Sequence, residues 1–190
     1  MSSGFRKLYR AAVLLLALAL LFLFGAEATD RALRTKREEA LLPFVLAAAE
    51  EFDVPPTLIL SVIRTESDFK KDALSAAGAI GPMQLLPETF YYLRDECLFE
   101  SLPDSALYDA ATNVRYGTYY LFYLSLRFDS ETAVLAAYNA GEGRVADWLQ
   151  NPELSSNGRL LTIPFAETRA YVKRVQSVRP HYMEKYHLKE

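Results

Sequence analysis

A run of apolar residues that ends in a single glutamate, followed by a loop of small residues, constrains this chain most. Pro56 is a suitable first-turn residue for a helix, because the backbone N–H that proline lacks would be unpaired there anyway. Ile59, Ile63 and Glu66 follow at steps of four and three, so they share one helical face. The sequence therefore predicts a helix over 56–66 whose apolar face carries a carboxylate near its end.

The position of Glu66 suggests that burial acts on its charge. Burial disfavours the charged form of a carboxyl, so we expect the pKa of Glu66 to be raised. A carboxyl that keeps its proton near neutral pH can donate that proton to a leaving group. The alternative is that Glu66 is a solvated or capping residue at an ordinary helix end.

The residues after Glu66 favour the acid. They form a dense pattern of small, polar and turn-forming residues, namely Ser67, Phe69, Ala73, Ser75, Gly78, Ala79, Gly81, Met83, Gln84, Pro87 and Thr89. This pattern resembles the first motif of the lytic transglycosylases of the soluble-transglycosylase (SLT) type, which cleave the glycan strands of peptidoglycan. Two positions depart from the family's pattern, because Lys71 replaces a usual proline and Pro82 replaces a usual leucine.

Three further motifs follow in the order that the family has them. The second is an Asn followed by a Gly and a Tyr-Leu pair, the third is Ala-Tyr-Asn-Ala-Gly, and the fourth is Glu-Thr followed by Tyr-Val. In this chain the residues that resemble the second motif are Asn113, Gly117 and Tyr120-Leu121. Residues 137–141 resemble the third motif, and Glu167-Thr168 with Tyr171-Val172 resemble the fourth. Gly117 costs about 1 kcal/mol relative to alanine inside a helix, so we expect another stretch of backbone to pack closely there.

The resemblance implies an all-α, mainly helical, lysozyme-like single domain with a groove for glycan. It makes Glu66 the catalytic residue, and it implies substrate binding by Ser75, Gln84, Leu86, Tyr138, Asn139, Glu167 and Tyr171. Leu86 stands where the family often has methionine. Without the resemblance, the alternatives are that Tyr138 is a packing residue before a helix end and that Glu167 is a solvated carboxylate paired with Arg174 or Lys173.

The same resemblance implies a reaction that needs one carboxylate. Glu66 would protonate the glycosidic oxygen between N-acetylmuramic acid (MurNAc) and N-acetylglucosamine (GlcNAc). It would then accept the proton of the C6 hydroxyl of the same MurNAc, which attacks its own anomeric carbon and leaves a 1,6-anhydro end. Most glycosidases use two carboxylates instead. The alternatives are a hydrolase of the goose-type lysozyme kind and a non-catalytic glycan-binding module.

The first residues are typical of an export signal. Arg6, Lys7 and Arg10 precede the apolar run Ala11–Phe24, which is shorter than a comfortable bilayer span. Residues 26–28 (Ala-Glu-Ala) look like a cleavage site, and an uncleaved signal-anchor is the alternative. Either reading puts the domain outside the cytoplasm, in the cell envelope, as a secreted or membrane-anchored protein.

The expected organisation is a signal peptide or signal-anchor over 1–28, a charged spacer over 29–39 and the SLT domain over 40–190. Residues 1–26 hold three of the 21 Lys and Arg and none of the 24 Asp and Glu, so the remainder carries a net charge of −6. That charge argues against nucleic acid as a partner. We expect a monomer that binds peptidoglycan and needs no cofactor, and the two histidines are too few for a metal site.

Overall fold

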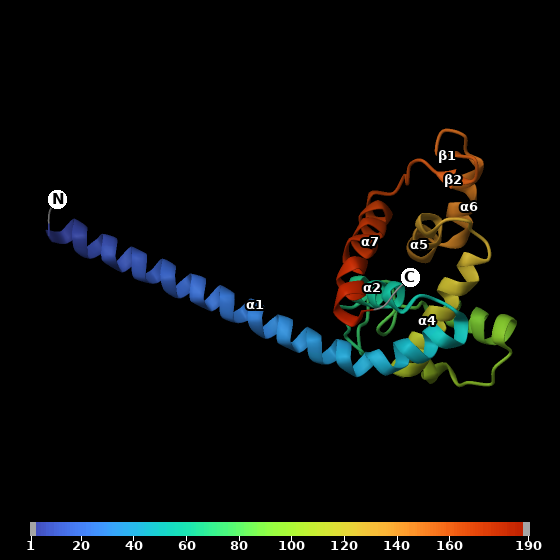
Figure 1. Cartoon of the computed structure of the whole chain (residues 1–190), viewed down its shortest axis with the longest axis horizontal. Coiled ribbons are helices and arrows are strands. Elements are labelled where there is room, and N and C mark those ends of the chain that lie inside the picture. The colour runs from blue at the N-terminus through green and yellow to red at the C-terminus, as the bar shows by residue number, and fades with distance from the viewer. Residues whose placement is uncertain (1–2, 188–190) are drawn as a thin grey trace. The chain divides into compact units, whose positions relative to one another are not determined.

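The structure is a computed structural model that describes residues 3–187, and these residues are mainly helical (Figure 1). The chain divides into two compact units, Met1–Glu39 and Ala40–Glu190. Helix α1 (Ser3–Phe52) supplies the described part of the first unit and the first element of the second. The mainly helical fold class predicted from the sequence is therefore present.

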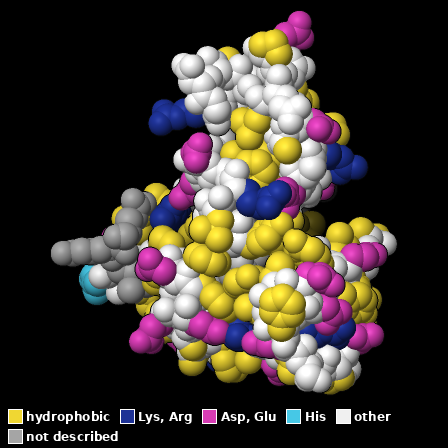
Figure 2. Space-filling model, turned by 90° about the vertical axis from the view of Figure 1, so that its right-hand side faces the viewer, with side chains coloured by type: hydrophobic (Ala, Val, Ile, Leu, Met, Phe, Trp, Pro, Cys, Tyr) yellow, Lys and Arg dark blue, Asp and Glu magenta, His cyan; other side chains and the backbone are white. Residues whose placement is uncertain are grey.

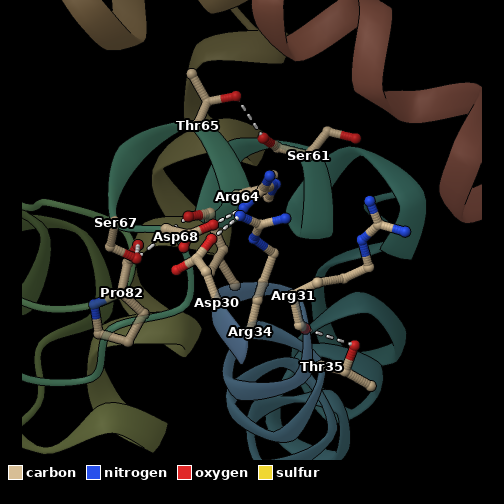
Figure 3. Close-up of polar contacts among 11 residues, drawn as sticks. Asp30, Arg31, Arg34, Thr35, Ser61, Arg64, Thr65, Ser67, Asp68 and Pro82 are labelled. Carbon is tan, nitrogen blue, oxygen red and sulfur yellow. Dashed lines mark hydrogen bonds and ion pairs between the residues drawn. The ribbon is translucent and has the colours of Figure 1, made fainter. Parts of the chain in front are cut away.

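The first unit has an apolar part and a charged part on one helix. Its described apolar side chains are exposed, namely Val13, Leu14, Leu15, Leu16, Leu18, Leu20, Leu21, Phe22, Leu23 and Phe24. Further along, Arg34 pairs with Asp30 at 2.6 Å, one helical turn away, and the hydroxyl of Thr35 donates to the carbonyl of Arg31 (Figure 3). Among the described residues, one helix (Val13–Phe52) has the length and composition to cross a membrane, and export signals share both properties.

The second unit continues with a series of helices and one small hairpin. The helices are α2 (Pro56–Glu66), α3 (Pro87–Tyr92), the π-helical turn η1 (Leu93–Leu98), the 3-10 helix η2 (Asp104–Tyr108), α4 (Ala110–Ser125), α5 (Glu131–Ala140), α6 (Glu142–Gln150) and α7 (Ala166–Tyr186). Strands β1 (Ser155–Ser156) and β2 (Arg159–Leu160) pair antiparallel, with Ser155 opposite Leu160. The sequence analysis did not predict this hairpin.

Helix boundaries follow the predicted ones closely where local signals set them. Helix α2 has the predicted bounds, 56–66. Helix α4 begins at Ala110, where the carboxylate of Asp109 accepts a hydrogen bond of 2.9 Å from the backbone N–H of Thr112. Such a side chain satisfies one of the free N–H groups of a helix start, so the helix begins earlier than its apolar pattern does.

Two clusters of buried side chains position the functional part of the second unit. The larger one joins α2 to α7, and it buries Ile59 and Ile63 from the first helix and Tyr171 and Val175 from the second. The smaller one consists of Ile80, Leu85, Phe90, Leu93, Leu107 and Tyr116. The larger cluster fixes the end of α2, and the smaller one fixes the loop that follows it.

Candidate active site

A cleft with a volume of about 400 Å³ opens beside the end of α2. Its lining comes from α2, the following loop, and helices α3 to α7, and it includes seven of the residues singled out in the sequence: Glu66, Ser75, Gln84, Leu86, Tyr138, Asn139 and Glu167. Four parts of the chain that are distant in sequence, 66–89, 120, 138–144 and 167, therefore contribute to one cavity. Tyr171 is the exception among the expected residues, because it lies in the core and is 2% exposed.

Glu66 is partly buried, and its ionisation is strongly perturbed. Burial raises the pKa of Glu66 from 4.5 to about 7, while the Tyr171 hydroxyl and the positive charge of Arg174 lower it in part. The raised pKa that the sequence predicted is confirmed, with burial as its main cause. Glu66 can therefore hold or release a proton near neutral pH.

Two tyrosines surround this carboxyl. Burial, and next the nearby charge of Glu66, raise the pKa values of both Tyr138 and Tyr171 well above the usual 10. The Tyr171 hydroxyl favours the ionised form of Glu66, although it makes no hydrogen bond of ordinary geometry with any described residue. Both tyrosines therefore stay neutral beside Glu66, and Tyr171 acts on it from the core side.

The loop over 67–86 forms one wall of the cleft and is closely hydrogen-bonded. Ile80 and Leu85 exchange two backbone hydrogen bonds, of 2.9 and 3.0 Å. The N–H of Gly81 donates to the carbonyl of Ala73 at 2.8 Å. These bonds fold the loop back on itself, so this wall is ordered although it contains no long helix or strand.

The two positions that depart from the family pattern lie in this loop. The hydroxyl of Ser67 donates to the carbonyl of Pro82 at 2.8 Å, which ties the end of α2 to the loop (Figure 3). That contact uses only the backbone oxygen of residue 82, so proline satisfies it as well as leucine would. Lys71 is exposed and lines no part of the cleft.

Two polar side chains of the loop face the cleft with part of their hydrogen-bonding capacity already used. The Ser75 oxygen accepts from the N–H of Ala79 at 2.9 Å, which leaves its O–H as a donor. The amide nitrogen of Gln84 donates to the carbonyls of Ala73 and Gly81 at 3.2 and 2.9 Å. Gln84 therefore presents mainly its amide oxygen, an acceptor, to the cleft.

Asn113 holds the loop from behind. Its side chain is fully buried, and its amide nitrogen donates to the carbonyls of Ile80 and Leu107 at 2.8 and 3.3 Å. Its amide oxygen accepts from the N–H of Met83 at 2.9 Å. Gly81 has a φ of +77°, and an added Cβ would lie 2.5 Å from the Asn113 side chain, so only glycine fits there.

Gly117 receives a side chain rather than the backbone that the sequence suggested. A Cβ at this position would lie 2.5 Å from the sulfur of Met83 and 2.7 Å from its Cβ. The expectation of close packing was right, but its partner was wrong, because Met83 directs its whole side chain onto α4. This contact and the Asn113 hydrogen bonds fix the same residue of the loop.

Tyr138 connects the loop wall to the helical wall. Its hydroxyl donates to the carbonyl of Met83 at 2.8 Å, across 55 residues of sequence. Burial, and next the nearby charge of Glu66, raise the pKa of Tyr138, so this tyrosine also lies close to that carboxyl. Its single proton is nevertheless engaged with the Met83 carbonyl, so Tyr138 has a structural bond in addition to any contact with substrate.

The sequence profile of the Transglycosylase SLT domain matches residues 43–158, more than half of the chain. The chain belongs to the Transglycosylase SLT domain family. The match spans the cleft up to α6, and the fourth motif, on α7, lies beyond it.

Two relatives of this SLT domain illustrate the range of the family. The soluble lytic murein transglycosylase of Salmonella typhimurium is 34% identical over 137 residues, which cover 68% of this chain and 21% of that protein. The membrane-bound lytic murein transglycosylase C of Actinobacillus pleuropneumoniae is 33% identical over 172 residues, which cover 77% of this chain and 47% of that protein. The chain thus spans about a fifth to a half of the length of these relatives.

Solved structures show the same fold. The lytic transglycosylase Slt of Pseudomonas aeruginosa, solved as an inactive mutant, superposes with a TM-score of 0.67 at 31% identity, over 76% of this chain and 24% of that chain. The 70-kDa soluble lytic transglycosylase in complex with bulgecin A superposes with a TM-score of 0.67 at 32% identity, over the same shares. The predicted all-α, lysozyme-like fold of the SLT domain is confirmed.

The sequence analysis missed three polar side chains that line the cleft, Thr89, Tyr120 and Arg144. Thr89 belonged to the first motif but was given no role, and Tyr120 was part of the second motif. Arg144 follows the third motif by three residues and lies in the first turn of α6. Its proximity to a motif was the available signal, because an arginine so close to a groove wall is a candidate for contact with a ligand.

Proposed function

We propose that this SLT domain is a peptidoglycan lytic transglycosylase, a lyase that cleaves the β-1,4 bond between MurNAc and GlcNAc and forms 1,6-anhydro-MurNAc ends. The observation that carries the proposal is one carboxyl of the cleft, that of Glu66, whose pKa is raised to about 7 among residues of the family motifs. The names of the relatives, which are lytic murein transglycosylases, support the same reaction.

In the first step Glu66 acts as a general acid. Near neutral pH a large fraction of the Glu66 carboxyl is protonated, because burial raises its pKa to about 7. It donates its proton to the glycosidic oxygen as the bond to the anomeric carbon of MurNAc breaks. A positioned acid of matched pKa accelerates such a step by about 10²- to 10⁴-fold.

In the second step the Glu66 carboxylate acts as a general base. The positive charge of Arg174 and the Tyr171 hydroxyl both favour the ionised form of Glu66, so they stabilise it after it has lost its proton. The carboxylate then accepts the proton of the C6 hydroxyl of MurNAc, and the C6 oxygen closes onto the anomeric carbon. The nucleophile is part of the substrate, so the protein has only to position it.

We assign the sugar contacts to the predicted residues that line the cleft beside Glu66, namely Ser75, Gln84, Leu86, Tyr138, Asn139 and Glu167. Ser75 offers a donor and Gln84 an acceptor, as their internal hydrogen bonds require. Leu86 is 40% exposed and supplies an apolar surface. Tyr171 acts through Glu66, because it lies behind the acid and does not line the cleft.

The chemistry of the products tests the proposal. The full chain, purified in detergent, is incubated with isolated sacculi, and the released muropeptides are analysed by mass spectrometry. We expect products that carry anhydro ends, which are lighter by one water than reducing ends. Reducing MurNAc ends would instead identify a hydrolase, and the absence of released muropeptides would favour a non-catalytic glycan-binding module.

We further propose that the protein works in the cell envelope, outside the cytoplasm, as a monomer. The exposed apolar residues from Val13 to Phe24 support residues 1–28 as a signal peptide or signal-anchor, with 29–39 as a spacer and 40–190 as the SLT domain. On the face shown in Figure 2, basic and acidic side chains alternate without a basic patch, which supports glycan rather than nucleic acid as the partner.

A further inference from the structure

Arg144 is an exposed cation at the cleft, and two contacts within the domain restrain it. One guanidinium nitrogen donates to the carbonyl of Ala140 at 2.9 Å. The guanidinium carbon lies 5.6 Å from the centre of the Phe165 ring. The Phe165 ring in turn packs edge-on against Trp148, with 5.2 Å between the two ring centres. The backbone carbonyl and the aromatic ring limit the freedom of a normally flexible side chain, so less of its entropy remains to be lost when it binds a ligand.

The charge of Arg144 is not neutralised by a carboxylate of the described residues. Among residues 3–187, no ion pair joins Arg144 to a carboxylate, although Glu66 and Glu167 line the same cleft. Other arginines of the domain are differently arranged, since Arg115 lies 2.6 Å from Glu51 and 2.9 Å from Glu100. A positioned guanidinium with free N–H groups and no protein carboxylate has the properties of a site for an anionic ligand.

We propose that Arg144 binds a carboxylate carried by the lactyl substituent of muramic acid, and thereby selects among strands by their substitution. This inference rests on the proposed function. The sugar hydroxyls and N-acetyl groups of the glycan are neutral, so its anionic groups are carboxylates on that substituent. In a peptide-free strand the lactyl group itself ends in a carboxylate, whereas in a substituted strand the carboxylates belong to the peptide. Arg144 is a binding residue in this scheme and takes no part in proton transfer.

The test uses three substrates that carry different carboxylates or none. The first is strands with intact peptides, the second is strands from which an amidase has removed the peptides, and the third is intact strands whose carboxylates have been methyl-esterified. Affinity is measured with the full chain carrying Glu66→Gln, with and without Arg144→Gln, so the strands are not cleaved during the measurement. Binding is thus observed whether or not the protein is a transglycosylase.

We expect Arg144→Gln to weaken binding by about tenfold or more for at least one carboxylate-bearing substrate, and to leave binding of the esterified strands unchanged. A loss confined to intact strands identifies a peptide carboxylate, and a loss confined to peptide-free strands identifies the lactyl carboxylate. Arg144→Lys should recover only part of the affinity, because an ammonium cannot form the bidentate pair. Equal losses on all three substrates, or no loss on any, would overturn the proposal.

Two controls separate this role from a structural one. Arg169→Gln is the matched control, because Arg169 also donates to backbone carbonyls, those of Ile163 and Pro164, but lies outside the cleft. It should leave all three affinities unchanged. In the active protein, Arg144→Gln should raise KM with little change in kcat, as expected for lost ground-state binding. Release of reducing ends by the unmodified protein would refute the proposed reaction while leaving the affinity results interpretable.

Discussion

The two walls of the cleft are built by different means. The loop wall, residues 67–86, is held by individual hydrogen bonds, and Asn113 alone supplies three of them. The helical wall, from α5 to α7, is held by apolar side chains such as Val145 and Val175, which are completely buried. A hydrogen-bonded wall depends on a few particular atoms, whereas a packed wall distributes its stability over many contacts.

Glu66 lines the cleft together with residues of both walls, and burial and the α7 side chains act on it in opposite directions. The α7 side supplies Tyr171 and Arg174, which favour the charged form, while burial by the surrounding protein favours the neutral form. The balance keeps the pKa near 7, within the range in which one group can serve as acid and then as base. The comparison teaches that one cleft can combine a wall of regular helices with a wall held by a few hydrogen bonds, and that the perturbed carboxyl lines the same cleft as both.

Removal of the carboxyl at the junction should have the largest effect. We expect Glu66→Gln to lower the rate of anhydro-muropeptide release by about a thousandfold, because glutamine can neither donate nor accept the proton. The measurement is the initial rate on purified sacculi. Glu88→Gln, an exposed carboxylate outside the cleft, is the matched control and should retain the full rate. Full activity of the Glu66→Gln protein would remove Glu66 as the acid.

The loop wall should be most sensitive to its buried hub. We expect Asn113→Ala to lower the free energy of unfolding by about 3 kcal/mol, because it removes three buried hydrogen bonds and leaves the Met83 N–H without its acceptor. Denaturant titration measures this, and the exposed Gln150→Ala should change it by less than about 0.5 kcal/mol. Asn113→Asp keeps the acceptor for Met83 and loses the two donors, so its loss should also be large. A loss below 1 kcal/mol in both variants would mean that the loop holds itself.

The part of the site that could be predicted from sequence depends on local pattern. Helix α2 has its predicted bounds, and the step from Ile63 to Glu66 placed a carboxyl on a buried face with the expected direction of pKa shift. The spacing of apolar residues along one helix contains this information, because each residue's face follows from its position alone. The family motifs then indicated which distant segments would meet Glu66.

The parts that could not be predicted depend on which distant atoms meet. The hydrogen bond from the Met83 N–H to Asn113 spans 30 residues, and the Tyr138 bond to the Met83 carbonyl spans 55. Gly117 signalled a close neighbour, but no local pattern could tell the Met83 side chain from a backbone. Arg144 was missed because the sequence does not show whether an arginine pairs with a carboxylate. That no carboxylate of the described residues pairs with Arg144 is a property of the folded cleft.

The acidity of Glu66 should appear in stability as well as in activity. Below pH 4.5 Glu66 is protonated in the folded and unfolded states alike, so it adds nothing. Between pH 4.5 and about 7 the unfolded state loses the proton while the folded state keeps it, which lowers the stability of the fold. Relative to wild type, Glu66→Gln should therefore be about equally stable at pH 4 and more stable at pH 8, by at most about 3 kcal/mol.

Thermal or denaturant unfolding of both proteins at several pH values measures this difference. The change with pH in the difference between their free energies of unfolding reports how well the surrounding protein excludes water from Glu66. If the stability advantage of Glu66→Gln rises between pH 4.5 and 7 and then levels off, the carboxyl is buried as the structure has it. A difference independent of pH would mean that Glu66 is solvated in the folded protein, and that the walls are open at their junction.

The smallest predicted effect tests the bond that joins the walls. Tyr138→Phe removes the hydroxyl that donates to the Met83 carbonyl and should destabilise the fold by about 1 kcal/mol. If this bond is the main role of the hydroxyl, the loss of activity in Tyr138→Phe should be no larger than its loss of stability explains. Tyr138→Phe should then also keep more activity than Tyr138→Leu. If activity falls at least a hundredfold with stability unchanged, the hydroxyl acts on the glycan or on Glu66, and Tyr138 belongs to the chemistry rather than to the junction.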